Sequence, residues 1–264
     1  MGSSTFNACC GSCRHKPLLT DNDAENLIRN ILYSVKIRDV DIEHFIECVD
    51  SNIKTKSFDT MKTIRKWITK EEYTKILNQL FYYEDNNHIK YSEYHNSLVI
   101  SYEVTEEDRL FGFIFYCWAI SLCQTSTTKI HYMYQIIKAL NSSYNAVNFE
   151  TFKRFLNTYL QINLAFFTNQ ITEKIDFNKY PCTSLQSQFD ELPKIFNINN
   201  IEKFQRTIVN ELEDILKRES SLTNIKNNEI ISQATIENLL ERHSYLLDCV
   251  DIRERFYNQF AFKM

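Results

Sequence analysis

Glycine and proline are scarce throughout this chain, and that scarcity restricts the folds open to it. Only three residues of each type occur among 264. Folds built only from β-strands need turn residues at regular intervals, so this composition disfavours them. Long stretches also repeat their apolar residues with a period of about 3.6, which is the period of an α-helix. The sequence therefore predicts an all-α protein.

The remaining composition is that of a folded protein with a substantial core. Hydrophobic residues make up 44% of the chain and aromatic residues 14%, and both shares argue against disorder. The length allows one domain or two lobes. The formal net charge of −4 is modest and gives no reason to propose nucleic acid as a partner.

The cysteines favour a reducing compartment over a disulfide framework. Of the eight cysteines, Cys9, Cys10 and Cys13 lie together near the N-terminus, and the others mostly fall in apolar helical patterns, where cysteine behaves as a small buried hydrophobe. The N-terminus lacks the apolar segment of a secretory signal peptide. The longest apolar run, Leu110–Cys123, is too short to span a bilayer and is expected to be a buried helix.

Apolar periodicity and capping residues place the helices. Thr105 and Asp108 form a capping box for a helix over Glu106–Leu122, which is apolar nearly all round and should be buried. A helix bearing Trp67 and Ile68 is expected after Phe58. Thr168–Asn199 holds two of the three prolines and is interpreted as an irregular linker. Further helices are predicted over residues 23–37, Asp41–Val49, Ile130–Leu140, 152–160 and Ile201–Lys217, and further apolar residues run from Leu239 to Val250 toward the C-terminus.

The stretch Ile76–Leu98 combines two helical patterns with a loop of twelve residues between them. Leu77, Leu80 and Phe81 form the apolar face before the loop Tyr82–Glu93, and Leu98 continues the apolar face after it. With Ile89 at loop position 8, Glu93 stands at position 12 and an aromatic residue follows. This stretch resembles an EF-hand of the calmodulin and neuronal calcium sensor family. The resemblance implies a helix–loop–helix unit that pairs with a second one.

Departures from the EF-hand pattern bear on calcium. Position 1 holds Tyr82 in place of Asp, position 6 holds Asn87 in place of Gly, and position 9 holds the cation of Lys90. A calcium ion takes about six to eight oxygen ligands, and this loop offers too few. We therefore expect no cofactor and a loop kept for its shape, with calcium binding as the alternative. The candidate calcium ligands are Glu84, Asn86, the His88 carbonyl and Glu93.

The apolar-x4-apolar cue of Ile89 and Tyr94 recurs along the chain. Ile53 and Ile89 are expected to form the short β-bridge of an EF-hand pair. Thr151 and Thr235 replace the closing Glu in later copies, which should therefore bind no calcium. The further copies of the cue are Ile53-x4-Phe58, Val147-x4-Phe152 and Ile231-x4-Ile236.

These patterns give a fold class and a domain organisation. We expect EF-hand-like helix–loop–helix pairs in one or two lobes. The predicted parts are a flexible, acylated tail over residues 1–20, an EF-hand-like lobe over 21–165, a linker over 166–200, and a C-terminal helical segment over 201–264, with an EF-hand-like fold as an option for that last segment.

The N-terminus resembles a dual-acylation signal. Removal of Met1 exposes Gly2 for myristoylation, and stable anchoring then needs a second lipid. The usual pattern has Ser or Thr where Phe6 stands. Two other interpretations remain open: a disordered terminus without lipid, or half a zinc site at Cys10, Cys13 and His15, which lacks a second ligand pair. The candidate lipidation sites are Gly2, Cys9, Cys10 and Cys13.

No catalytic constellation emerges from the sequence. The three glycines cannot form a phosphate-binding loop, and His88 and His95 have no partners that suggest a triad. We therefore expect a protein that is not an enzyme: a lipid-anchored adaptor or scaffold at the cytoplasmic face of a membrane, which binds a protein partner through apolar helical surfaces. The alternatives are a structural subunit of a large ciliary or organellar assembly, and a calcium sensor working through the Tyr82–Glu93 loop.

Overall fold

The computed structural model describes residues 41–53, 64, 67–81, 109–123, 127–141, 147–174, 192–219 and 230–261. Most of these residues are helical, which confirms the all-α prediction, and four short strands form two sheets. The helices are α2 (Ile42–Asn52), α4 (Lys70–Phe81), α6 (Gly112–Leu122), α7 (Thr127–Leu140), α8 (Phe149–Lys174), α10 (Ile198–Glu219), α11 (Gln233–Arg242), the 3-10 helix η2 (Ser244–Leu247) and α12 (Cys249–Ala261). The strands are β1 (Trp67–Thr69), β2 (Arg109–Phe111), β3 (Val147–Asn148) and β4 (Ile230–Ile231).

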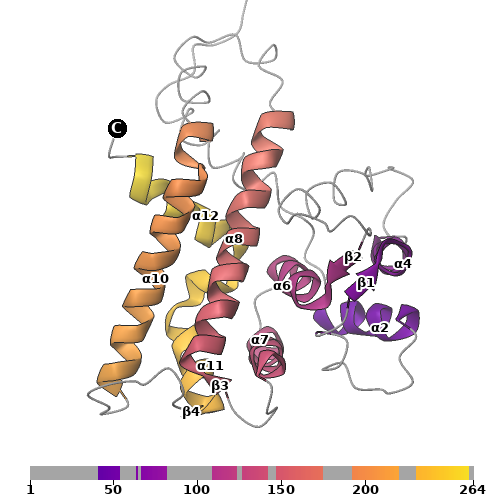
Figure 1. Ribbon diagram of the computed structural model, residues 1–264, viewed down its shortest axis with the longest axis horizontal. Coiled ribbons are helices and arrows are strands. Elements are labelled where there is room, and N and C mark those ends of the chain that lie inside the picture. Colours follow the sequence, from indigo (N-terminus) through magenta and orange to yellow (C-terminus); the bar gives the residue numbers. More distant parts are fainter. Residues whose placement is uncertain are drawn as a thin grey trace, which may run out of the picture.

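The strands pair two by two, and each leads into a helix. β1 pairs antiparallel with β2, with Ile68 opposite Leu110. β3 pairs antiparallel with β4, with Val147 opposite Ile231. The helices α4, α6 and α8 begin directly after β1, β2 and β3, and α11 begins one residue after β4. Each sheet therefore brings together two helices that are distant in sequence (Figure 1).

Short polar side chains explain why the strands end and the helices begin where they do. At the end of β1, Thr69 and Glu72 form a capping box, with the Thr69 backbone N–H donating to Glu72 Oε2 at 2.9 Å. In β3, Asn148 Oδ1 accepts the Thr151 N–H at 2.8 Å. After β4, Ser232 Oγ accepts the Thr235 N–H at 3.1 Å. Such caps each contribute about 1 kcal/mol to helix stability.

The structure differs from three predictions in the N-terminal half: the start of one helix, a helix that is a strand, and a β-bridge. The helix predicted over Glu106–Leu122 begins only at Gly112, because Arg109–Phe111 pairs with β1. Trp67 and Ile68 lie in β1 and not in a helix. The predicted bridge from Ile53 to Ile89 is not seen at Ile53, which caps the C-terminus of α2 with its N–H donating to the Val49 carbonyl. Ile89 lies outside the described residues, and the pairing described in this half joins β1 and β2.

The helix predicted over Asp41–Val49 is confirmed as α2, with Asp41 Oδ1 accepting the Glu43 N–H at 2.8 Å. Those predicted over Ile130–Leu140 and Ile201–Lys217 are confirmed as α7 and α10. The helix predicted after Phe152 is α8, which continues to Lys174, into the segment predicted to be irregular, because no glycine or proline interrupts it.

α8 is the central helix of the core. It contacts α6, α7, α10 and α12, and it runs alongside α10 (Figure 1). Phe155 and Tyr159 of α8 stack with ring centroids 5.5 Å apart. Phe256 of α12 packs against Phe196, with ring centroids 4.7 Å apart. As predicted, α6 is buried nearly all round, since it lies against α8 and α7.

A buried lysine joins the start of α7 to the C-terminal helices. Lys129 is only 1% exposed. Its Nζ donates to the Cys123 carbonyl, after α6, at 2.7 Å and to the Leu247 carbonyl at the end of η2. Hydrogen bonds from a buried charged donor are stronger than neutral ones, and carbonyls left without a donor are costly. Lys129 therefore stabilises the contact between the two halves of the chain.

Replacing this lysine tests that statement. We expect Lys129→Met to lower the free energy of unfolding by about 2–4 kcal/mol, measured by urea denaturation under reducing conditions. The matched control is Lys203→Met on α10, where the lysine is exposed and the loss should stay below about 0.5 kcal/mol. Equal losses for the two variants would contradict the role given to Lys129.

Candidate functional site

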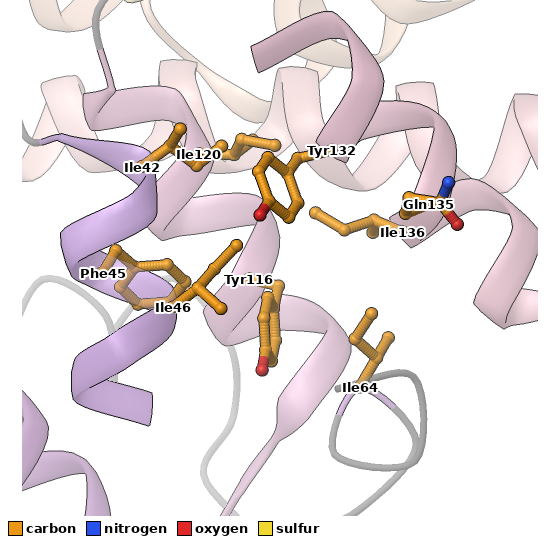
Figure 2. A pocket seen from close by; sticks show the side chains of 9 residues that line it. All are labelled: Ile42, Phe45, Ile46, Ile64, Tyr116, Ile120, Tyr132, Gln135 and Ile136. Atoms are coloured by element: carbon orange, nitrogen blue, oxygen red, sulfur yellow. The ribbon is translucent and has the colours of Figure 1, made fainter. Parts of the chain in front are cut away.

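An apolar pocket lies between α2, α6 and α7 (Figure 2). It is partly open to solvent and has a volume of about 130 Å³. Among the surfaces of the described residues it is the strongest candidate for a binding site, because apolar concave sites with few polar groups are where proteins bind ligands. The pocket is lined by Ile42, Phe45, Ile46, Ile64, Tyr116, Ile120, Tyr132, Gln135 and Ile136.

Helical periodicity places these side chains on three converging faces. On α2, Ile42, Phe45 and Ile46 are spaced i, i+3 and i+4, so they share one side of the helix. On α6, Tyr116 and Ile120 are spaced i and i+4. The same spacing brings Tyr132 and Ile136 of α7 to one face. The pocket forms where these three apolar faces meet (Figure 2).

Aromatic contacts fix the walls of the pocket. The Phe45 ring lies 5.6 Å from the Phe115 ring and 5.5 Å from the Tyr116 ring, which it meets edge to face. Such pairs add to the stabilisation that burial gives. Ile64 is 1% exposed and contributes a further part of the wall. The walls of the pocket are therefore held in place by side chains that pack against one another.

Few polar groups face the pocket. Burial raises the pKa of Tyr132, and the nearby carboxylates of Glu43 and Asp50 raise it further, so its hydroxyl is neutral at physiological pH. Figure 2 shows this hydroxyl pointing toward Ile46. Gln135 Nε2 lies 3.3 Å from His131 Nε2. Since a charge buried in an apolar pocket is costly, the site favours an uncharged, mainly apolar group.

The lining is mostly aliphatic and aromatic, with the hydroxyls of Tyr116 and Tyr132 and the amide of Gln135 as its polar groups. None of the residues that line it is a His, Cys, Asp, Glu or Ser. In the described ranges, no three His, Cys, Asp or Glu side chains gather into a group able to hold a metal ion.

Besides Lys129, the buried polar side chains of Arg253 and Asn163 lie inside the core, where they join α12 to α8. Arg253 is 1% exposed, and its Nε donates to the Asn163 carbonyl at 3.2 Å. Asn163 Nδ2 in turn donates to the Tyr159 carbonyl at 2.7 Å. Burial raises the pKa of the Tyr159 phenol well above its usual range and lowers that of Arg253. These contacts connect helices within the core, and we interpret the group as structural.

The site residues predicted from sequence lie elsewhere in the chain. Gly2, Cys9, Cys10 and Cys13 lie outside the described residues, and so does the whole Tyr82–Glu93 loop with Glu84, Asn86, His88 and Glu93. The apolar face of α2 was visible in the sequence, but the pocket was not. The sequence feature nearest to the pocket is the apolar pattern of α6, which extends nearly all round the helix.

Comparisons with protein-family models, with curated proteins and with solved structures found no match to this chain. Among the helices of the described part, none is long and apolar enough to cross a membrane.

Proposed function

We propose that this protein is a non-catalytic adaptor with an EF-hand-like architecture. It binds an amphipathic helix of a partner protein by taking one apolar side chain into the pocket between α2, α6 and α7. A lipid anchor at Gly2 and at the N-terminal cysteines holds it at the cytoplasmic face of a membrane. The observation that carries the binding proposal is the apolar pocket with aromatic walls.

The order of elements supports an EF-hand-like architecture. Two units have the order helix, short strand, helix: α7–β3–α8 and α10–β4–α11. The strands pair antiparallel, β1 with β2 and β3 with β4, as the loops of paired EF-hands do. Val147 and Ile231, which begin two copies of the predicted cue, lie opposite each other.

The paired strands β1 and β2 indicate different starting residues for the apolar-x4-apolar cue in the N-terminal half. Ile68 and Leu110 occupy the paired positions, and aromatic residues follow five positions later at Tyr73 and Phe115. The cue therefore recurs at all four strands, and in this half it begins at Ile68 and Leu110 instead of Ile53 and Ile89.

That register supports calcium independence. With Ile68 at position 8, Glu72 stands at position 12, but Met61 and Arg65 occupy positions 1 and 5, where calcium requires oxygen ligands. Glu72 also accepts hydrogen bonds from the N–H and the hydroxyl of Thr69. In the β3 and β4 units, Thr151 and Thr235 replace the closing Glu, and their hydroxyls or N–H groups are engaged with Asn148 and Ser232.

The pocket volume indicates what kind of group it takes. Its 130 Å³ is close to the volume of about 150 Å³ at which an apolar cavity accepts benzene. One Leu, Ile, Met or Phe side chain is of that size, and burying it contributes about 1.5–3 kcal/mol. A helix that lays its apolar face into a groove presents such anchor side chains.

Filling the pocket should abolish partner binding. We place the photo-cross-linking residue benzoylphenylalanine at Gln135, a half-buried residue of the pocket lining, and irradiate native membranes. A discrete adduct is expected, and it should disappear when Ile46→Phe fills the pocket. The control for the substitution is Ile215→Phe on α10, which should leave the adduct unchanged.

The cross-linker at the exposed Asn210 of α10 should give no adduct of the same mass. An adduct that survives Ile46→Phe, or that forms equally from Asn210, would contradict the proposed site.

The lipid anchor is tested by a single substitution. Gly2→Ala removes the only acceptor for an N-terminal myristoyl chain, and membrane affinity then falls because palmitoylation of the cysteines depends on the first attachment. We expect the full chain to move from the membrane pellet to the supernatant in cell fractionation. Ser3→Ala is the matched control and should remain in the pellet. A Gly2→Ala chain that still sediments with membranes would contradict the anchor.

A further inference from the structure

The chain enters its described part at the apolar pocket. α2 begins at Ile42, and this first residue of the helix lines the pocket (Figure 2). Residues 1–40 lie outside the described residues, so the segment that precedes α2 is joined to the molecule at the pocket itself. A tethered segment meets a neighbouring site at a high effective concentration. The segment before α2 is therefore the first occupant to consider for this pocket.

That segment contains the helix predicted over residues 23–37. Only the three residues 38–40 separate it from Asp41, which caps α2, and three extended residues span about 11 Å at most. A connection this short makes two helices antiparallel neighbours, so the predicted helix is expected to fold back along α2. Its apolar face is made of Leu27, Ile28, Ile31, Leu32 and Val35.

α2 presents a row of carboxylates beside its pocket-lining face. Glu43, Glu47 and Asp50 are exposed and are spaced i, i+4 and i+7, so they share one side of the helix. After burial, the charges of Glu43 and Asp50 are what raises the pKa of the Tyr132 phenol in the pocket lining. α2 itself contains no Lys or Arg. The rim of the pocket is therefore anionic on the α2 side.

The predicted helix carries the complementary charges at the same spacing. Its two basic residues, Arg29 and Lys36, are seven positions apart, as Glu43 and Asp50 are. In an antiparallel pair joined through residues 38–40, Lys36 lies opposite Glu43 and Arg29 lies opposite Asp50. Each base and its acid are equally distant from the connection, so the two pairs form in one register.

The rotation of the two helices agrees with this register. Arg29 directly follows Ile28 of the apolar face, just as Glu43 directly follows Ile42 of α2. Each charged row is thus turned from its apolar face by about 100° in the same sense. Two antiparallel helices with this pattern bring their charged rows together while both apolar faces point toward the same core. The apolar face of the 23–37 segment then lies over the pocket.

The other charges of this region do not oppose the pairing. Asp23 and Glu25 of the segment lie beyond the end of α2 in this register. Lys62 and Arg65, which lie outside the described residues, are sequence neighbours of Ile64, and Figure 2 shows Ile64 across the pocket from α2.

We propose that residues 23–37 are an occupant of the pocket supplied by the chain itself. They form an amphipathic helix that folds back along α2 and covers the pocket with its apolar face, with Leu32 nearest to Ile46. The inference rests on the pocket of the proposed function and supplies its regulation, because a partner helix must displace the segment before it binds. An occupied site lowers the apparent affinity for the partner in proportion to the fraction of molecules that is open.

The test uses the purified full chain alone, with benzoylphenylalanine at Gln135. Irradiation should give an adduct at the monomer mass, and mass spectrometry of its digest should join position 135 to a peptide from residues 23–37. Leu32→Asp should lower the yield of this adduct about fivefold or more, because a charge opposes burial in the pocket. Asn30→Asp, on the opposite side of the predicted helix, is the matched control and should keep the yield.

Charge reversal tests the register. Arg29→Glu and Asp50→Lys should each lower the yield about twofold, which is the size of effect that an exposed ion pair has. The chain with both substitutions should regain the parent yield, because the opposite charges face each other again. Asp50 is near the C-terminus of α2, where a cation is favourable. Circular dichroism checks that each variant is folded.

The inference would be overturned if irradiation gave no adduct to residues 23–37, or if Leu32→Asp left the yield unchanged. An adduct of twice the monomer mass would overturn it in favour of a second copy of the chain as the occupant. A double charge variant that stays as low as the single variants would overturn the pairing with α2. The proposed function is tested separately by an adduct to another protein in native membranes, so either proposal can fail without the other.

Discussion

Two short backbone pairings determine how the helices of this protein meet. Ile68 lies opposite Leu110 and Val147 lies opposite Ile231, so residues far apart in sequence are joined by only a few hydrogen bonds. Because a helix follows each strand, the pairings set the positions from which α4, α6, α8 and α11 begin. α6 then lies between α8 on one side and α2 and α7 on the other, and the apolar pocket forms on that second side.

Strong helical periodicity made much of the fold predictable, and the short strands were the part that could not be predicted. α2, α7 and α10 lie where their apolar spacing indicated. A strand of two or three residues carries no usable period, so Arg109–Phe111 was absorbed into the predicted helix. The apolar-x4-apolar cue points to Val147 and Ile231, which pair with each other. So common a pattern also points to Ile53, whereas the residue that pairs in β1 is Ile68, opposite Leu110.

The candidate site shows a different limit of the sequence. The sequence pattern predicts an apolar face on each helix, but three such faces can meet in many ways. Only tertiary packing decides that Ile46, Tyr116 and Tyr132 line one pocket. The exposed Trp67 was likewise invisible, since an aromatic residue in an apolar pattern is expected in the core. Both features need the strand register, which sends Ile68 inward and Trp67 outward.

The central proposal is that the pocket forms independently of calcium. The five isoleucines of its lining allow a direct measurement of their contacts. Methyl NMR of the chain labelled at isoleucine δ1 reports on the five isoleucines that line the pocket. These are Ile42 and Ile46 of α2, Ile120 of α6, Ile136 of α7, and Ile64. The account predicts methyl–methyl contacts between these helices in the presence of chelator, unchanged when millimolar calcium is added. Contacts that appear only with calcium, and are lost in Glu93→Gln, would contradict it and make the protein a calcium sensor.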